Sequence, residues 1–511
     1  MVPEEREIHG QHIPSDHTAL NLANVFSGLT TSLSRSGIIV FAVAALLRSI
    51  PEVLAGKYPV GFDVNAYYPY LIMSFPSISA LDMLKAGPLF YAVMWSIQSV
   101  TGADVFLLLK IAGPVIYGIL SASFLVFLVK FLKLSLQKAT FGTVLLILQP
   151  IALRISWDLF RNEIGLAFGL VALASLRTNW RQKYVIAGSL GLLAVLAHPL
   201  AAVLMFVGTF GLLLSTKLNR ERVKIIVGFA PSAVLFLVAA FVLHFVPQGQ
   251  SSIITLSADP NGSAHSVLYS AFLVQDGFLG PAHLDAIQHA VLLFLFSFAP
   301  ILAFVAKGFW FEPTLGAITA WTGLASFSFV ISPVLSIPIY WRWEILLIFP
   351  FAIYSLKGLD KLGLFNPNRA LARRILMGFF LLLALGYTTG AFSYMGSYGV
   401  NSFAPGTMVQ GSISESQVDA SLASLTWLKE HAPANSILLS DERFISYSYL
   451  TIGNSLRMIV QPGGPPSQTA VSQALALRPS HLFIIWDSSL SLDGFSTVHS
   501  ENGISILQYG S

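Results

Sequence analysis

Lys57-Tyr-Pro-Val-Gly-Phe-Asp63-Val-Asn-Ala-Tyr-Tyr68 directly follows the first apolar run of the chain, which begins near Gly37. That run is long enough to cross a bilayer, so the stretch places a carboxylate at the mouth of a membrane helix. An acidic group held at such a position is costly and usually marks function.

The composition places the chain in a bilayer. Hydrophobic residues make up 55% of the 511 residues and charged residues only 11%. A soluble domain of this size could not cover that much apolar surface with so few charges. The net charge of +4 predicts no nucleic-acid partner, because the basic residues lie in short loops between apolar segments. The lack of cysteine excludes disulfides, thiolate chemistry and cysteine-ligated zinc.

About eleven apolar segments reach the roughly 17–25 residues that a membrane helix needs. They lie near 36–54, 105–130, 138–156, 160–177, 184–198, 199–216, 222–246, 286–306, 313–331, 343–359 and 374–394. The sequence therefore predicts an α-helical polytopic membrane protein, with residues 36–394 as its transmembrane domain.

The basic loops predict the orientation of these segments. With a cytoplasmic N-terminal segment (1–35) and an external C-terminus, the loop lysines and arginines all fall on the cytoplasmic side, as the positive-inside rule requires. They are Lys130, Lys133, Lys138, Arg177, Arg181, Lys183, Lys217, Arg220, Arg222, Lys224, Lys307, Lys357, Lys361, Arg369, Arg373 and Arg374. We expect a multi-pass protein of the cell membrane.

This orientation constrains residues 55–104. The apolar run Pro88–Val100 cannot be a full crossing, because every later basic loop would then invert. We expect one long external loop with helices lying in the interface, which its tyrosines and Trp95 suit. An ordinary second span with an odd topology is the alternative.

The composition changes after Tyr394. Residues 395–415 resemble a linker, and 416–430 has the spacing of an amphipathic helix. Short apolar runs at 436–440, 456–460, 481–486 and 504–508, with a helix near 470–477, indicate a small external α/β domain over 416–511. It shows no phosphate loop, metal cluster or catalytic triad, which favours a lid or an acceptor-docking module. A second external loop covers 247–285.

Charged residues that the loop rule does not explain collect on the outer side. They are Arg48, Lys57, Asp63, Asp82, Lys85, Arg154, Asp158, Arg161, Glu163, Arg342 and Glu344, with His198 nearby. Positive-inside statistics keep Lys and Arg away from that side. Their presence calls for anionic partners, either the nearby carboxylates or a bound phosphate.

Each of these candidates also has a purely structural interpretation. Arg154, Asp158 and Arg161 are three or four residues apart, so a helical turn would join them in a salt-bridge cluster. Arg342 lies between two tryptophans, which suits either a snorkelling arginine or a bidentate phosphate contact. His198-Pro199 separates two spans, where a histidine is more often a packing residue. Lys85 could be a solvated loop lysine.

Four motifs, in this order, resemble the GT-C superfamily of integral membrane glycosyltransferases, which includes protein O-mannosyltransferases and lipid A aminoarabinose transferases. The first is Asp63 soon after the first span. The others are Lys85-Ala-Gly-Pro-Leu-Phe-Tyr91, the run from Gly102 to Lys110-Ile-Ala-Gly-Pro114, and Trp157-Asp-Leu-Phe-Arg-Asn-Glu163. The resemblance covers residues 36–394.

The resemblance implies an outward-facing enzyme that takes a sugar from a polyprenyl-phosphate donor and inverts the anomeric carbon. Asp63 would be the general base on the acceptor hydroxyl, and Asp158 or Glu163 a second acidic residue. Cations would stabilise the phosphate leaving group, a role that suits Lys85, Arg161 and Arg342, with His198 beside them. The acceptor would be a glycan, a lipid or a protein, and membrane lipids surround the chain.

The chain departs from the family in two respects. Asp63 is followed by Val64 where a second acidic residue is common, and the Trp-Trp-Asp-Tyr-Gly signature of oligosaccharyltransferases is missing. Without an Asp-x-Asp pair we predict no metal and no cofactor, although Asp63 with Asp158 would be the pair to hold a metal. A transporter or flippase for a lipid-linked or anionic substrate is the alternative function, and a non-catalytic scaffold is a third.

Overall fold

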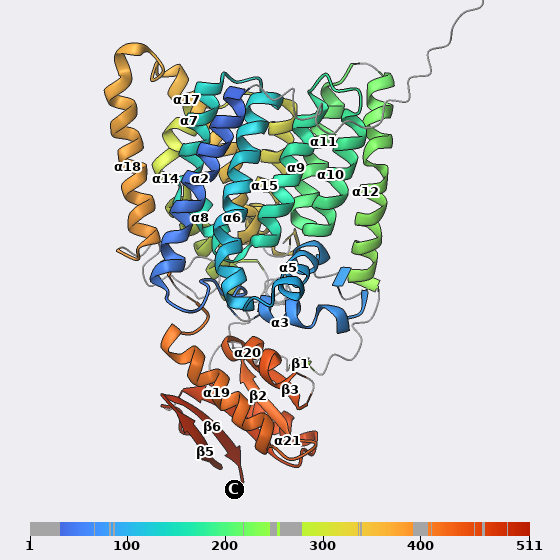
Figure 1. Cartoon of the computed structure of the whole chain (residues 1–511), viewed down its shortest axis with the longest axis vertical. Coiled ribbons are helices and arrows are strands. Elements are labelled where there is room, and N and C mark those ends of the chain that lie inside the picture. Colours follow the sequence, from blue (N-terminus) through green and yellow to red (C-terminus); the bar gives the residue numbers. More distant parts are fainter. Residues whose placement is uncertain are drawn as a thin grey trace, which may run out of the picture.

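The computed structural model describes a helical bundle with a small α/β domain at one end (Figure 1). The described residues are 31–65, 67–80, 83–84, 87–217, 219–245, 253–255, 278–335, 337, 340–391, 407–409, 411–453, 455–461, 465–487 and 489–510. The candidate residues Asp82 and Lys85 lie outside them, as do most of the N-terminal segment, the second external loop and the linker.

The bundle consists of long helices that run up and down its length (Figure 1). They are α2 (Thr31–Leu54), α6 (Val105–Val126), α7 (Leu136–Ile147), α8 (Pro150–Asp158), α9 (Phe160–Leu176), α10 (Lys183–Ala197), α11 (Pro199–Ser215), α12 (Asn219–Phe245), α14 (Pro281–Gly308), α15 (Pro313–Ile331), α17 (Ile348–Lys361) and α18 (Ala370–Thr388). Six of the described helices are long and apolar enough to cross a membrane, namely α2, α6, α12, α14, α15 and α18. The number rises to seven if the bent pair α7–α8 forms one span, so the expected eleven crossings are not confirmed.

A sharp break separates α7 from α8. The two helix axes meet at 65°, and Pro150 stands at the first turn of α8. Proline cannot donate the backbone hydrogen bond that would continue α7, and its ring restricts the residue before it to an extended conformation. The break therefore turns the short helix α8 away from the direction of α7.

Two short helices cover the end of the bundle that faces the α/β domain. They are α3 (Tyr67–Met73) and α5 (Pro88–Thr101) (Figure 1). With 14 residues, α5 is about 21 Å long, too short for a hydrocarbon core of about 30 Å. The turns that join α6 to α7, α9 to α10, α11 to α12 and α14 to α15 lie at the opposite end of the bundle (Figure 1). These turns carry many of the basic loop residues.

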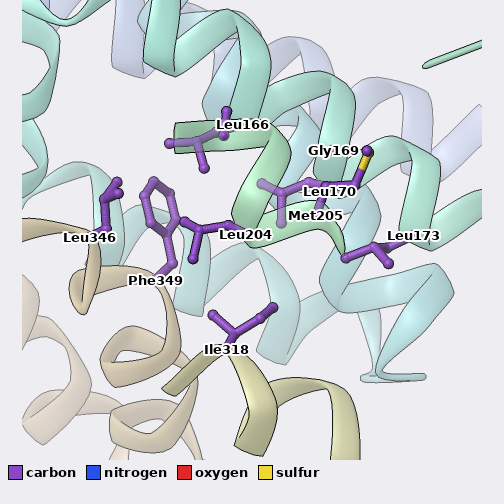
Figure 2. A pocket seen from close by; sticks show the side chains of 10 residues that line it. Leu166, Gly169, Leu170, Leu173, Leu204, Met205, Ile318, Leu346 and Phe349 are labelled. Carbon is purple, nitrogen blue, oxygen red and sulfur yellow. The ribbon is translucent and has the colours of Figure 1, made fainter. Parts of the chain in front are cut away.

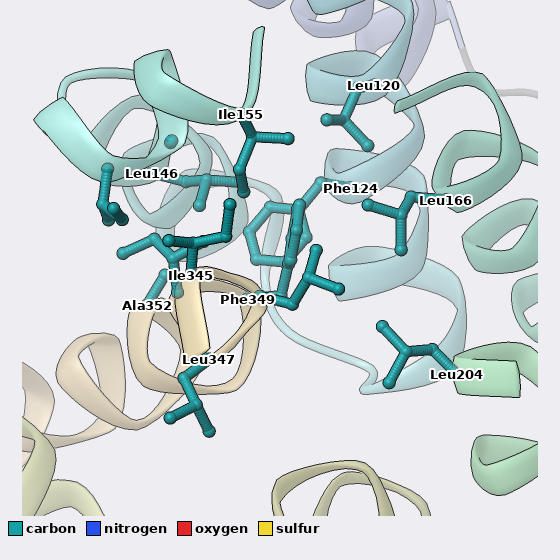
Figure 3. Packing of buried hydrophobic residues seen from close by; sticks show 14 of the residues in the cluster. Leu120, Phe124, Leu146, Ile155, Leu166, Leu204, Ile345, Leu347, Phe349 and Ala352 are labelled. Carbon is teal, nitrogen blue, oxygen red and sulfur yellow. The ribbon is translucent and has the colours of Figure 1, made fainter. Parts of the chain in front are cut away.

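The bundle core lies where α6, α8, α9, α11 and α17 meet. Phe124 of α6 and Phe349 of α17 face each other with ring centroids 6.0 Å apart. Figure 3 shows Leu166 and Leu204 beside this pair, reaching in from α9 and α11. Because lipid is as apolar as these side chains, close packing and not exclusion from water holds the helices together.

Glycines allow α14 and α17 to approach closely. A Cβ atom on Gly358 would lie 2.0 Å from the carbonyl oxygen of Phe304, and one on Gly308 would lie 1.8 Å from that of Tyr354. Small residues at helix contacts are the usual means of close packing in membranes. The contact therefore requires a hydrogen atom at both positions.

The C-terminal domain has a six-stranded sheet of order β1-β3-β2-β4-β6-β5. The strands are β1 (Ile253–Thr255), β2 (Ile437–Asp441), β3 (Arg457–Gln461), β4 (Leu482–Asp487), β5 (Phe495–Glu501) and β6 (Ile504–Tyr509). Strands β1, β3, β2 and β4 are parallel, whereas β6 and β5 add an antiparallel hairpin. Helices α19 (Glu415–His431), α20 (Glu442–Ile452) and α21 (Gln468–Ala476) complete the domain.

The sequence pattern missed three elements of this domain. Strand β5 was missed because its mostly half-exposed side chains leave no apolar run. Helix α20 was missed although Asp441 caps it by accepting a hydrogen bond from the backbone of Arg443 at 2.8 Å. Strand β1 comes from the loop between α12 and α14, and sequence patterns do not reveal a strand pairing across about 200 residues.

Gly358→Ala tests the close approach of α14 and α17. The added methyl group would clash with the backbone of α14, so we expect a loss of roughly 1–3 kcal/mol of stability, measured as a lower melting temperature in detergent. The matched control is Gly378→Ala in α18, where an added Cβ meets nothing within 4 Å. That change should be neutral or slightly stabilising, because alanine favours helix over glycine. Equal melting temperatures for the two variants would contradict the packing argument.

Candidate functional site

Asp63 lies in the loop between α2 and α3, against the end of α8. Gly61 has a φ of +125°, and a Cβ atom there would lie 2.4 Å from the carbonyl oxygen of Trp157. The hydroxyl of Tyr68 donates to the carbonyl oxygen of Asp158 at 2.8 Å. These two contacts hold the Asp63 loop on the last turn of α8.

Charges of both signs surround the Asp63 carboxylate. Burial raises its pKa above the ordinary value, and the negative charge of Asp158 raises it further. Arg342, Arg161 and Arg154 act in the opposite direction. The charges that act on the loop carboxylate therefore come from α8, α9 and α16 (Tyr340–Leu346).

Arg154 and Asp158 form a buried ion pair on α8. The Arg154 Nη1 to Asp158 Oδ1 distance is 2.6 Å, and both side chains are at least 95% buried. The guanidinium carbon of Arg154 also lies 5.0 Å from the centre of the Trp157 ring. The structural interpretation of this pair therefore holds, and Asp158 contributes a carboxylate that is already engaged.

Arg161 lies apart from that pair, among aromatic rings. Its guanidinium carbon is 5.6 Å from the ring centre of Tyr68 and 5.4 Å from that of Tyr91. Cation–π contacts of this kind hold a guanidinium in place without neutralising its charge. The charge of Arg161 also acts on Asp63.

Arg342 approaches the same site from α16 (Tyr340–Leu346). Trp341 and Trp343 on either side of it are buried, and Trp343 packs edge-to-face on Trp321 at 6.0 Å. Arg342 itself is only half-buried and acts on the charges of both Asp63 and His198. The two tryptophans therefore anchor the helix that presents this guanidinium.

His198 sits at the turn between α10 and α11. Its Nδ1 accepts a hydrogen bond from the backbone N–H of Leu200 at 3.1 Å, which caps α11. Burial, then the positive charges of Arg161 and Arg342, hold its pKa well below the ordinary value. The imidazole is therefore neutral near pH 7, with its proton on Nε2, and can act as a hydrogen-bond donor but not as a cation.

Glu163 lies deeper than the rest. It is fully buried, and neither carboxylate oxygen has a hydrogen-bond partner among the described residues. The charges of Arg48 and Asp158 act on it. Arg48 is itself buried on α2, with its Nη1 2.8 Å from Glu52 Oε1 and its Nε donating to the carbonyl oxygen of Ser156 at 3.1 Å. Glu163 is therefore a buried carboxyl group near these charges, without a hydrogen bond to the described residues.

An apolar cavity of about 490 Å³ adjoins the charged cluster. It lies between α5, α6, α9 and α10, with Phe90, Ile116, Ile164, Phe168 and Leu190 among its lining residues. Phe90 packs on Tyr68 and Tyr91, whose rings hold Arg161, at 5.3 and 5.5 Å. One aromatic cluster therefore forms the boundary between an apolar chamber and a fixed cation.

A second apolar cavity of about 40 Å³ lies between α9, α11, α15 and α17. Figure 2 shows Leu166, Leu204, Ile318 and Phe349 around it, with no polar side chain among its lining residues. A cavity of this kind stays dry and offers nothing to orient a ligand. It is a packing gap of the bundle.

Six candidate residues thus have a known place. Asp63, Asp158, Arg161, Arg342 and His198 share one site, Glu163 lies beneath it, and Lys85 lies outside the described residues. Within the part of the chain that the structure describes, no group of three or more His, Asp or Glu side chains could hold a metal ion.

The sequence interpretation missed part of the site's scaffold. Tyr68 and Tyr91 were taken as interfacial aromatics, although they hold Arg161 in place. The ammonium group of Lys110 on α6 donates to the carbonyl oxygens of Glu52 and Gly56, each at 2.5 Å. A lysine inside a predicted span, just below an external loop, was the available signal.

No family model matches this chain, and no curated protein matches its sequence. Among solved structures it is similar to the arabinofuranosyltransferase AftD from Mycobacteria, with 14% identity, a TM-score of 0.52, and coverage of 92% of this chain and 40% of that one. It is also similar to ArnT from Cupriavidus metallidurans bound to undecaprenyl phosphate, with 13% identity, a TM-score of 0.49, and coverage of 92% and 97%. A third similar structure is the oligosaccharyltransferase AglB from Archaeoglobus fulgidus with an inhibitory peptide and a dolichol-phosphate, at 14% identity, a TM-score of 0.49, and coverage of 88% and 69%.

The likeness to the arabinofuranosyltransferase shows a shared fold. This chain spans about two fifths of the length of that protein, at 40% coverage. The chain therefore has the fold of the matched part of that membrane protein, over 92% of its own length.

Asp158→Ala tests the buried ion pair. Removing one partner of such a pair leaves a buried, uncompensated charge and typically costs about 3–5 kcal/mol. We therefore expect a clear fall in melting temperature in detergent. The double variant Arg154→Met with Asp158→Leu removes both charges and should melt close to the native protein. If the Asp158→Ala protein is as stable as the native one, the ion pair does not contribute to the stability of the fold.

Proposed function

We propose that this GT-C-fold protein transfers a sugar from a polyprenyl-phosphate-linked donor to an acceptor hydroxyl on the outer side of the cell membrane. The charges of Arg161 and Arg342 act on Asp63, and this observation carries the proposal. The tyrosine rings that hold Arg161 also pack on Phe90, which lines an apolar cavity of about 490 Å³. A carboxylate, two guanidinium groups and a lipid-sized chamber are the parts that such a transfer needs.

The cavity and the cations would bind the two halves of the donor. The apolar chamber between α5, α6, α9 and α10 suits a prenyl chain, which offers only hydrocarbon. Arg161 at its boundary and Arg342 beyond it would contact the phosphate, and Nε2 of His198 would donate a hydrogen bond. Lys85 would join them from the same external loop as Asp63.

Asp63 would act as the general base. The acceptor oxygen attacks the anomeric carbon, and its proton passes to a carboxylate oxygen of Asp63 as the new C–O bond forms. The bond between the anomeric carbon and the phosphate oxygen breaks, and its electron pair stays on the phosphate. A single displacement of this kind inverts the anomeric configuration.

The environment of Asp63 suits this role. A general base works best when its pKa approaches the working pH, and burial together with Asp158 raises the pKa of Asp63 in that direction. Asp158 would tune the base in this way without receiving the proton itself. Glu163 would support the site from beneath, through Arg48.

Asp63→Asn is the central test. An asparagine keeps the shape of the side chain but cannot take up a proton, so kcat for sugar transfer should fall by about 10²–10⁴-fold. Binding of the polyprenyl phosphate and the melting temperature should stay near the native values. Asp493→Asn, an exposed change in the C-terminal domain, is the matched control. Full activity of the Asp63→Asn protein would refute the assignment.

The pH dependence of kcat/KM offers a second test. Activity requires ionised Asp63, so it should fall as the pH drops through the raised pKa of this carboxyl group. Arg342 lowers that pKa, so Arg342→Gln should move the acidic limb to higher pH and weaken donor binding. Lys429→Gln, on the exposed surface of α19, should leave the limb in place. If the acidic limb does not move in Arg342→Gln, Arg342 does not act on the pKa of Asp63.

A further inference from the structure

The loop that carries Asp63 is fixed by contacts and not by regular structure. Residues 55–65 connect α2 to α3 through turns and bends, with positive φ angles at Gly56 and Gly61. A general base must be held within a fraction of an ångström of its working position. The contacts of this loop therefore decide whether Asp63 can act.

The transmembrane domain holds the loop at its start and, at Gly61, against the end of α8. The Lys110 ammonium donates to the carbonyl oxygens of Glu52, Gly56 and Tyr58, at 2.5, 2.5 and 3.1 Å. These three bonds fix the chain as it leaves α2. They do not reach Asp63 itself.

The C-terminal domain and the segment just before it hold the loop on both sides of Asp63. Tyr58 is only 3% exposed and packs into the hydrophobic core of that domain, while its hydroxyl donates to Asp419 Oδ1. The Lys57 ammonium lies 2.7 Å from the same oxygen. Beyond Asp63, the Oγ atom of Ser412 donates to Asn65 Oδ1 at 3.2 Å.

Two backbone contacts close the same interface. The backbone N–H of Lys57 donates to Glu415 Oε1 at 2.5 Å. Gly61 and Gly411 form a parallel β-bridge two residues before Asp63. In contrast, Arg161 and Arg342 lie on α9 and α16, and not on the loop that this interface holds.

We propose that the C-terminal α/β domain is a positioning element for Asp63, with Asp419 and Tyr58 as its positioning residues. This inference rests on the proposed function and deepens it. The docked domain holds the general base against the acceptor, whereas donor binding is left to the bundle. Loss of docking therefore lowers kcat and leaves the donor KM unchanged.

Asp419→Ala is the primary test. Removing its carboxylate deletes the acceptor for both Lys57 and Tyr58, and we expect kcat to fall on the order of tenfold to a hundredfold. The donor KM should stay at the native value. Asp419→Asn keeps an acceptor oxygen for Tyr58 and should retain most of the activity. Asp493→Ala, in the same domain but outside this interface, should behave like the native protein.

A reversible cross-link gives a rescue. The chain contains no cysteine, so Asn65→Cys with Ser412→Cys forms one defined pair across the interface. Under oxidising conditions the disulfide should restore kcat to the Asp419→Ala protein, and reductant should abolish the gain. The same cross-link can be formed in the protein that keeps Asp419. If that oxidised protein is inactive, the proposal is overturned, because the domain would then have to undock during turnover.

The cross-link also gives a readout that does not depend on catalysis. Under mild oxidation, Asp419→Ala should lower the yield of the disulfide between the two introduced cysteines. An unchanged yield overturns the positioning role whatever the activity of the protein. If the native protein transfers no sugar from any lipid-phosphate donor, while the double-cysteine protein loses its cross-link on Asp419→Ala, the proposed function is refuted but the docking contact stands.

Discussion

The structure depends on the contacts that stabilise its buried charged side chains in a region with little water. A buried charge without a partner is expensive, and the described part of the chain solves this by pairing charges within one helix turn and by surrounding a cation with aromatic rings. Arg154 with Asp158 and Arg48 with Glu52 are each four residues apart. Arg161 instead lies over two tyrosine rings, which hold its charge in place. Arg154 and Arg48 thus take part in ion pairs within a helix, whereas aromatic rings hold Arg161 at the candidate site.

The sequence predicted most helices of the bundle, because apolar runs of this length have few alternatives to a helix. It also grouped Asp63 with Arg161 and Arg342, since the positive-inside rule leaves such residues unexplained on the outer side. The number of crossings was harder to predict. Helices α10 and α17 have only 15 and 14 residues, and the apolar runs in the sequence do not show where such a helix begins and ends.

The rest could not be read from sequence for physical reasons. Arg154 and Asp158 pair within α8, whereas Arg161 lies on α9, beyond a helix end at Asp158 that periodicity does not reveal. The contact of Tyr58 with Asp419 joins residues 361 positions apart. Local patterns contain no information about such contacts, whereas they do predict the helix and the loop that carry them. The same limit applies to β1, whose partner strand lies in the C-terminal domain.

Strand β1 limits how well the C-terminal domain could exist without the rest of the chain. The loop between α12 and α14 supplies this strand, which covers the edge of β3 by parallel pairing. A domain severed from the membrane part would leave the backbone groups of β3 open to a neighbouring molecule, and an uncovered edge of this kind invites strand-to-strand aggregation. The loop between α12 and α14 thus protects the C-terminal domain from aggregation. The helical bundle and the C-terminal domain therefore share one sheet and depend on each other.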